Sequence, residues 1–193
     1  MPQFLPQSTR IDARVMMFID GENLAMRYKA QLGEQQPVSH VQYISDVMVW
    51  SEYATRIRGP QDFIRRHYYT AACQDDDYRK NIETKLKNIG IEAPSVFPRT
   101  RNRSSKRVDI TLATDMLTHA HRKNYDIAVL VTGDEDYVPL VEAVKGEGCR
   151  VVLWALSSGL SPALKKAADH YWDIGELLFQ ESKGDTAFTA IYG

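Results

Sequence analysis

Two segments more than a hundred residues apart each run from an apolar stretch directly into carboxylates. Asp20 follows the first stretch, in VMMFIDGEN (Val15–Asn23), and Asp134 and Asp136 follow the second, in VLVTGDEDY (Val129–Tyr137). Such runs are typical of parallel strands in an open α/β sheet, where loops at the carboxyl ends of the strands meet at a ligand-binding crevice. Carboxylates held together raise one another's pKa unless a cation lies among them. The three Asp residues therefore predict a shared pocket that holds a divalent metal ion.

A fourth carboxylate comes from the segment KRVDITLATDML (Lys106–Leu117), which precedes the second strand. Its spacing predicts a helix, and Asp109 in the first turn shares a face with Leu112 and Met116. An ionised carboxylate on an apolar face needs a metal ion, a salt bridge or backbone donors. We therefore expect Asp109 at the crevice or beside a cation. Asp115 points about 120° away on the same helix and is interpreted as a structural group.

Helix capping is the alternative explanation for several of these side chains. Asp20, Asn23 and Asp136 each stand near the expected start of a helix, and Asp and Asn are common N-caps. Asp134 is harder to explain in this way, because the GDED turn needs only one cap. A further acidic run, Asp75–Asp77, is interpreted as solvated surface whose last residue caps a helix.

Composition limits the classes of function. The 193-residue chain has 24 Lys and Arg against 25 Asp and Glu, a formal charge of −1 and a pI near 6.5, which excludes a generally basic nucleic-acid-binding surface. One basic run, RTRNRSSKR (Arg99–Arg107), holds five of these cations in nine positions and is predicted to be a loop. The chain has no G-x-S-x-G elbow, no Walker loop and no G-x-G-x-x-G turn.

Two features of the sequence bear on the cellular compartment of the protein. Cys73 and Cys149 are too few for a disulfide framework and lack the paired spacing of a structural zinc site, so we expect reduced thiols. No segment approaches the roughly 20 apolar residues of a membrane span. We therefore expect a cytoplasmic protein without a membrane partner, and the sequence leaves open whether the chain forms a homodimer.

The apolar pattern alternates between strand and helix along the chain. Strands are predicted at 15–19, 63–70, 91–96, 127–132 and 150–155, with a short edge element at 171–174. Helices are predicted around 39–48, 82–89, 106–117, 136–147 and 161–168. This alternation favours an α/β fold with a mainly parallel sheet of five or six strands covered on both faces. We predict a single domain over 1–193, with a core of about 13–180 and tails at 1–12 and 182–193.

Three segments together resemble the motifs of the NYN domain, in the LabA-like branch of the PIN-like nuclease group. They are FIDGENL (Phe18–Leu24), KRVDITLATDML, and VTGDEDYVPLV (Val131–Val141), and their order and spacing match across most of the chain. The resemblance implies a PIN-like, Rossmann-like α/β/α sandwich and metal-dependent cleavage of RNA.

Carried over residue by residue, the resemblance assigns five functional positions. Asp20 matches the Asp after the first strand, Asn23 the Asn three residues later, and Asp109 the Asp of the middle helix. Asp134 and Asp136 match the acidic pair that follows the fourth strand of the family. The sequence departs from the family pattern by having Thr132 for a common Ser, Arg107 for a common Gly and Glu135 for a small polar residue.

These observations predict a ribonuclease that uses Mg²⁺ or Mn²⁺. The predicted metal ligands are Asp20, Asp109, Asp134 and Asp136, the last as a ligand or a water-orienting group. Asn23 is expected to position a ligand or a phosphate. The residues expected to hold the backbone of single-stranded RNA are Arg101, Arg103, Lys106 and Arg107.

Other functions remain open at this point. The chain could be a non-catalytic RNA-binding or regulatory protein that keeps the carboxylates without turnover. It could also be a metal-dependent phosphatase, although the basic run would then have no use on a small substrate. The last alternative is a doubly wound domain whose acidic turns are only helix caps.

Overall fold

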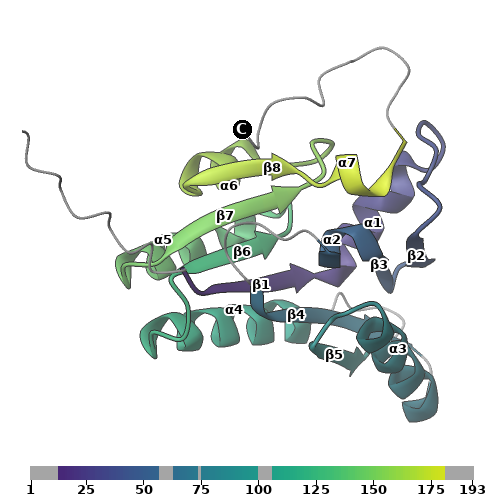
Figure 1. Ribbon diagram of the computed structural model, residues 1–193, viewed down its shortest axis with the longest axis horizontal. Coiled ribbons are helices and arrows are strands. Elements are labelled where there is room, and N and C mark those ends of the chain that lie inside the picture. Colours follow the sequence, from purple (N-terminus) through teal and green to yellow (C-terminus); the bar gives the residue numbers. More distant parts are fainter. Residues whose placement is uncertain (1–12, 57–62, 74, 100–105, 181–193) are drawn as a thin grey trace, which may run out of the picture.

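A computed structural model describes residues 13–56, 63–73, 75–99 and 106–180 of the chain. Its main feature is a six-stranded sheet in the order β5-β4-β1-β6-β7-β8, in which every neighbouring pair is parallel. Figure 1 shows the six strands running in one direction. The strands are β1 (Val15–Asp20), β4 (Phe63–Ala72), β5 (Ala93–Pro98), β6 (Ile127–Val131), β7 (Arg150–Ala155) and β8 (His170–Asp173).

Helices follow the strands and cover both faces of the sheet (Figure 1). They are α1 (Gly21–Gln31), α2 (Glu52–Arg56), α3 (Asp76–Asn88), α4 (Lys106–His121), α5 (Val138–Gly146), α6 (Pro162–Ala167) and α7 (Gly175–Leu178), with a 3₁₀ helix η1 (Glu135–Tyr137) ahead of α5. The predicted α/β sandwich with a parallel sheet is confirmed. Across the described ranges, no helix combines the length and the apolar character needed to span a bilayer.

One predicted helix is wrong. The region of Val41, Ile44 and Met48 forms an antiparallel hairpin of two strands, β2 (Val41–Ile44) and β3 (Met48–Ser51). The i, i+3 spacing of the apolar residues suggested a helix, but the chain reverses at Asp46, whose φ is +59°. Burial of β3 against β4 decides the outcome, since tertiary packing overrides a short periodic pattern.

Two hydrophobic cores lie on opposite faces of the sheet, and β1 contributes to both by alternation. Met17 and Ile19 face the core formed with α1, α3 and the β2–β3 hairpin. Met16 and Phe18 face the core formed with α4, α5 and α6. Side chains along a strand alternate between faces, so Asp20 is on the same side as Met16 and Phe18. The end of β1 therefore directs a carboxylate toward α4 and α5.

The strand order places a topological switch point beside that carboxylate. From β1 the chain adds β4 and β5 on one side, and it then returns to add β6, β7 and β8 on the other. The direction of winding therefore reverses between β1 and β6. Ligands of open parallel sheets bind at the carboxyl ends of the strands at such a switch point.

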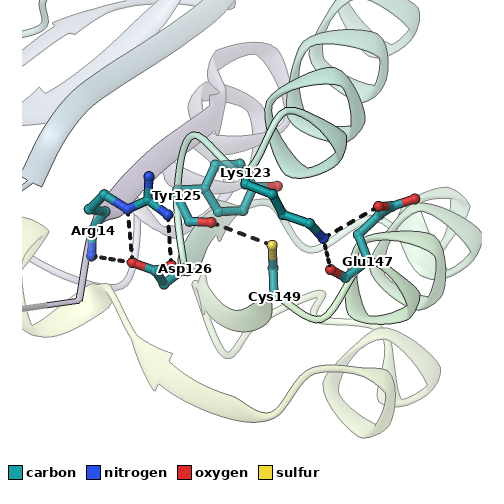
Figure 2. Close-up of polar contacts among 6 residues, drawn as sticks. All are labelled: Arg14, Lys123, Tyr125, Asp126, Glu147 and Cys149. Carbon is teal, nitrogen blue, oxygen red and sulfur yellow. Dashed lines mark hydrogen bonds and ion pairs between the residues drawn. The ribbon is translucent and has the colours of Figure 1, made fainter. Parts of the chain in front are cut away.

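The opposite, amino-terminal edge of the sheet is closed by polar contacts (Figure 2). Arg14 precedes β1, and its guanidinium and backbone N–H donate to the Asp126 carboxylate at 2.8–3.1 Å. Nearby, the Lys123 ammonium lies 3.6 Å from the Glu147 carboxylate, and the buried Cys149 thiol donates to the Tyr125 carbonyl. These contacts join the starts of β1, β6 and β7, at the edge of the sheet opposite the carboxyl ends of the strands.

Gly21 is required by packing. Its φ is not in the left-handed region, so the turn after Asp20 does not itself require a glycine. A Cβ at this position would lie 2.1 Å from the ring of Tyr68. The Tyr68 hydroxyl is bonded to both the N–H and the carbonyl of Val49 at 3.1 Å, so the ring is fixed.

We predict that Gly21→Ala lowers the free energy of unfolding by about 1–3 kcal/mol through overpacking. Urea denaturation followed by circular dichroism measures the change. The matched control is Gly146→Ala, because nothing lies within 4 Å of a Cβ at Gly146. Equal midpoints for the two variants would contradict the packing argument.

Candidate functional site

Asp20 lies at the centre of the site and is almost fully buried, with 3% of its surface exposed. One carboxylate oxygen accepts a hydrogen bond from the backbone N–H of Asn23 at 3.1 Å, so Asp20 caps α1 as the simpler explanation proposed. The other accepts from the Thr132 hydroxyl at 3.3 Å. Burial, with a further contribution from the charge of Asp109, raises the pKa of Asp20 to about 7. A helix cap needs no burial of this kind, so capping does not account for the burial and the raised pKa of Asp20.

Asn23 joins the two acidic turns to each other. Its side-chain oxygen accepts a hydrogen bond from the backbone N–H of Gly133 at 3.0 Å. The residue is buried, and this contact bridges a separation of 110 residues. In this arrangement the side-chain amide oxygen of Asn23 fixes the turn after β6.

The sequence suggested Asp136 as a helix cap, but in the structure Asp134 is the cap. Asp134 is the N-cap of η1, since its side chain accepts from the backbone N–H of Asp136 at 3.1 Å. The Thr132 hydroxyl accepts from the backbone N–H of Asp134 at 3.3 Å while donating to Asp20. Asp136 is exposed, and Tyr137, not Asp136, stands at the N-cap of α5. The Asp136 carboxylate is therefore not used as a cap.

Asp109 approaches the same place from the first turn of α4. Its carboxylate accepts a hydrogen bond from the Tyr137 hydroxyl at 3.3 Å. Partial burial raises its pKa, the Tyr137 hydrogen bond opposes that rise, and the charges of Asp134 and Asp136 add to it. Asp109 thus interacts electrostatically with Asp20 on one side and with the acidic turn on the other, while a shared metal-binding pocket stays a prediction.

Tyr137 is a site residue that the sequence analysis missed. It is 4% exposed, and its hydroxyl lowers the pKa of both Asp20 and Asp109 by hydrogen bonding. Its position directly after the acidic GDED turn is the signal that could have identified it. Burial and the neighbouring carboxylates raise the pKa of the phenol itself, which stays a proton donor.

The donor chemistry of the four carboxylates fits a hard divalent cation, which takes oxygen ligands. Their side-chain positions, however, follow the hydrogen bonds described above. Within the part of the chain that the structure describes, no group of three or more His, Cys, Asp or Glu is spaced to hold a metal ion. Asp136 is exposed, and Asp109 is only partly covered, with its carboxylate bonded to the Tyr137 hydroxyl.

The basic residues lie at the side of the crevice next to β5. Arg101 and Arg103 fall outside the described residues. Lys106 and Arg107 begin α4, and the Arg107 guanidinium lies 4.9 Å from the centre of the Phe97 ring. Only this half of the predicted RNA-binding set has a described position.

An ion pair on the same side was not predicted. Arg99, which follows β5, pairs with the carboxylate of Glu22 in the first turn of α1. Both side chains are largely buried, and the Arg99 backbone N–H donates to the Ala72 carbonyl at 2.9 Å. Burial lowers the pKa of Arg99. The pair fixes the end of β5 against the helix that Asp20 caps.

The other carboxylates of interest are accounted for by local structure. Asp75, not Asp77, caps α3 through the backbone N–H of Tyr78, and Asp77 is exposed beside Lys80. Asp115 accepts from the Tyr69 hydroxyl at 2.9 Å, in keeping with its interpretation as a structural group.

Comparison with known proteins gives one family match. The sequence model of the NYN domain matches residues 14–175. A 73-residue stretch is 33% identical to an uncharacterized protein of Methanocaldococcus jannaschii, and it covers 38% of this chain but 30% of that protein's length. The crystal structure of a protein of unknown function from Vibrio parahaemolyticus superimposes with a TM-score of 0.63 at 16% identity, over 88% of this chain and 97% of the other. That likeness shows a shared fold.

The raised pKa of Asp20 predicts an unusual pH dependence of stability. The folded pKa of about 7 lies above the ordinary value of 3.8, so the unfolded chain loses this proton first. The stability that protonated Asp20 contributes to the folded state is fully present below pH 3.8 and is lost as the pH rises through 7. Asp20→Asn keeps the cap acceptor and removes the charge. We expect the variant to be more stable than the wild type at pH 8 by about 1 kcal/mol or more, with a flatter profile between pH 4 and 7.

Denaturation at a series of pH values measures this difference. Asp126→Asn is the matched control, because hydrogen bonds from Arg14 lower the pKa of Asp126 and the sign is reversed. That variant should lose stability at pH 8. If Asp20→Asn is instead less stable than the wild type at pH 8, Asp20 is a helix cap and nothing more.

Proposed function

The chain belongs to the NYN domain family, whose fold is nuclease-like, and from this premise we propose that it is a metal-dependent ribonuclease. We further assign it to the LabA-like branch, on the FIDGENL motif and the acidic turn VTGDEDY. The observation that carries the proposal is that hydrogen bonds bring carboxylates from three separate chain segments together: Thr132 links Asp20 to the turn of Asp134 and Asp136, and Tyr137 links that turn to Asp109. Helix capping accounts for two of these carboxylates and leaves the convergence of all four unexplained.

The proposed metal ligands are Asp20, Asp109 and Asp134, with Asp136 as a fourth ligand or a group that orients the attacking water. A bound Mg²⁺ or Mn²⁺ ion would lower the pKa of a water molecule and neutralise charge on the phosphoryl oxygens. The Asp109 carboxylate is held by the Tyr137 hydroxyl, and the Asn23 amide keeps the β6 turn against α1. Lys106 and Arg107 present positive charge beside the crevice for the substrate backbone.

A second candidate is a regulatory RNA-binding protein without turnover. The observation that favours it is that Asp20, Asp109 and Asp134 all accept hydrogen bonds from the protein itself. In that case the carboxylates would organise the loops and the basic edge would bind RNA. A phosphatase is less favoured, since the basic residues beside α4 suit a polymeric phosphate better than a small ester.

Asp134→Asn tests the nuclease directly. The amide keeps the oxygen that caps η1, so the fold should survive, while a ligand charge is removed. We expect cleavage of labelled single-stranded RNA by the wild type with Mg²⁺ or Mn²⁺, none with chelator, and a loss of about 10²-fold or more in the variant. Gel electrophoresis of the products under single-turnover conditions measures the rates.

Asp77→Asn is the matched control, because Asp77 is exposed in the first turn of α3. It should cleave at the wild-type rate. An Asp134→Asn variant that cuts as fast as the wild type would remove the proposed catalytic site. Binding of RNA by the wild type without cutting in either metal would favour the regulatory protein.

Tyr137→Phe tests the residue that the structure adds to the site. The Tyr137 hydroxyl lowers the pKa of Asp20 and Asp109, so its removal should raise both values. The acidic limb of the pH–rate profile should therefore move to higher pH, with the rate on the alkaline plateau reduced less than tenfold. A uniform fall in rate at every pH, with no displacement of the limb, would show that Tyr137 acts only through packing.

A further inference from the structure

Helix α1 carries a polar stripe that starts at the candidate site and runs away from it. Asn23, Arg27 and Gln31 are spaced four residues apart and so lie on one face of the helix. Asn23 contacts the turn after β6, and the Gln31 amide donates to the hydroxyl of Ser158 in the loop between β7 and α6. The stripe therefore faces the two turns that follow β6 and β7.

The middle residue of this stripe is a cation that its neighbours do not neutralise. The Nε of Arg27 is buried without a hydrogen-bond partner, while the residue as a whole is half-buried. Among the described residues, no carboxylate forms an ion pair with it. The Nε atoms of Arg66 and Arg99 are also without a hydrogen-bond partner, but those two side chains form ion pairs with Glu92 and Glu22. Arg27 differs from them in having no carboxylate partner among the described residues, so its charge is available to an anion.

The Arg27 guanidinium is held by close contact with backbone. A Cβ at Gly159 would lie 2.3 Å from Arg27 Nη1, and Gly159 has a φ of +81°. Any residue other than glycine would therefore be strained and would push the guanidinium away. The loop is thus shaped around Arg27, although it offers the guanidinium no hydrogen-bond acceptor.

The same loop connects Arg27 to the crevice. The Gly159 carbonyl lies 3.0 Å from the position of a Cβ on Gly133, and the Ser161 N–H donates to the Gly133 carbonyl at 3.0 Å. Gly133 in turn donates to Asn23 beside Asp20. Arg27 therefore stands on the β7 side of the acidic centre, across the switch point from Arg107 on the β5 side.

We propose that Arg27 binds a backbone phosphate of the substrate strand, next to the phosphate that is cut. The inference rests on the proposed function and adds the path of the strand, which crosses the carboxyl edge of the sheet from Arg107 to Arg27. A planar guanidinium donates two parallel hydrogen bonds to a phosphate, which suits this position. A contact with a phosphate depends on its charge and not on the base, so the same contact can form with any nucleotide sequence.

Binding of a fluorescent single-stranded oligouridylate, measured by anisotropy, tests the proposal. The measurement uses the Asp134→Asn background, so that the strand is not cut. Arg27→Met keeps the aliphatic stem and removes the charge, and we expect about tenfold weaker binding at low salt. The slope of log K against log salt should become shallower by about 0.7, the value for one phosphate contact on a single strand. Arg27→Lys should fall between Met and the wild type.

The matched control is Arg150→Met, which removes the same charge from an exposed residue at the start of β7, on the opposite edge of the sheet. This control should bind within twofold of its parent with an unchanged slope. Thermal unfolding of each variant verifies that the fold is kept.

The outcomes separate this inference from the nuclease proposal. If RNA binding depends on Arg27 but the wild-type chain, which keeps Asp134, does not cut RNA, the phosphate-binding role of Arg27 is confirmed and the nuclease proposal fails. If the chain with Asp134 cuts RNA while Arg27→Met binds as tightly as its parent, the nuclease stands and the Arg27 inference is overturned. Equal losses in Arg27→Met and Arg150→Met would also overturn it, because they would show only a long-range effect of charge. Failure of the parent to bind any strand overturns both.

Discussion

The site depends on one interaction between distant parts of the chain, the hydrogen bond from the Gly133 N–H to the Asn23 side chain. It ties the turn after β6 to the first turn of α1, so the two acidic turns cannot move apart. The Thr132 hydroxyl strengthens this link, because it bonds to Asp20 and to the backbone of Asp134 at once. Both Asn23 and Thr132 are uncharged, and both serve to position carboxylates.

Two of the carboxylates, Asp20 and Asp109, oppose folding when they are ionised. Burial and the charge of Asp109 raise the pKa of Asp20 to about 7, and burial with the charges of Asp134 and Asp136 raises the pKa of Asp109. A chain under no other constraint would replace a buried, repelling carboxylate by an amide or an apolar side chain. Residues that cost stability and yet stand together at the switch point of a parallel sheet are typical of functional sites. The electrostatics thus support function where each hydrogen bond alone supports only capping.

Much of the fold could be predicted from the sequence, because strands such as Val15–Asp20 are apolar throughout and end at marked turns. The hairpin at Val41–Ser51 could not, since its short apolar spacing also suits a helix and burial against β4 decides between them. At the site, the residue types and their order along the chain predicted the meeting of Asp20, Asp109 and the acidic turn. Tyr137 follows the acidic turn directly, but which carboxylate its hydroxyl contacts depends on the packing of α4, and the position of Arg27 beside Gly159 leaves no local pattern in the sequence.

Close contacts at three glycines set the shape of this edge of the sheet. Gly21 lies against the Tyr68 ring, Gly133 against the Gly159 carbonyl, and Gly159 against Arg27. Because these positions have no Cβ, the start of α1 and the turns after β6 and β7 can lie this close to their neighbours. None of the three contacts involves a carboxylate, so the close packing of this edge does not need the charge of the acidic side chains.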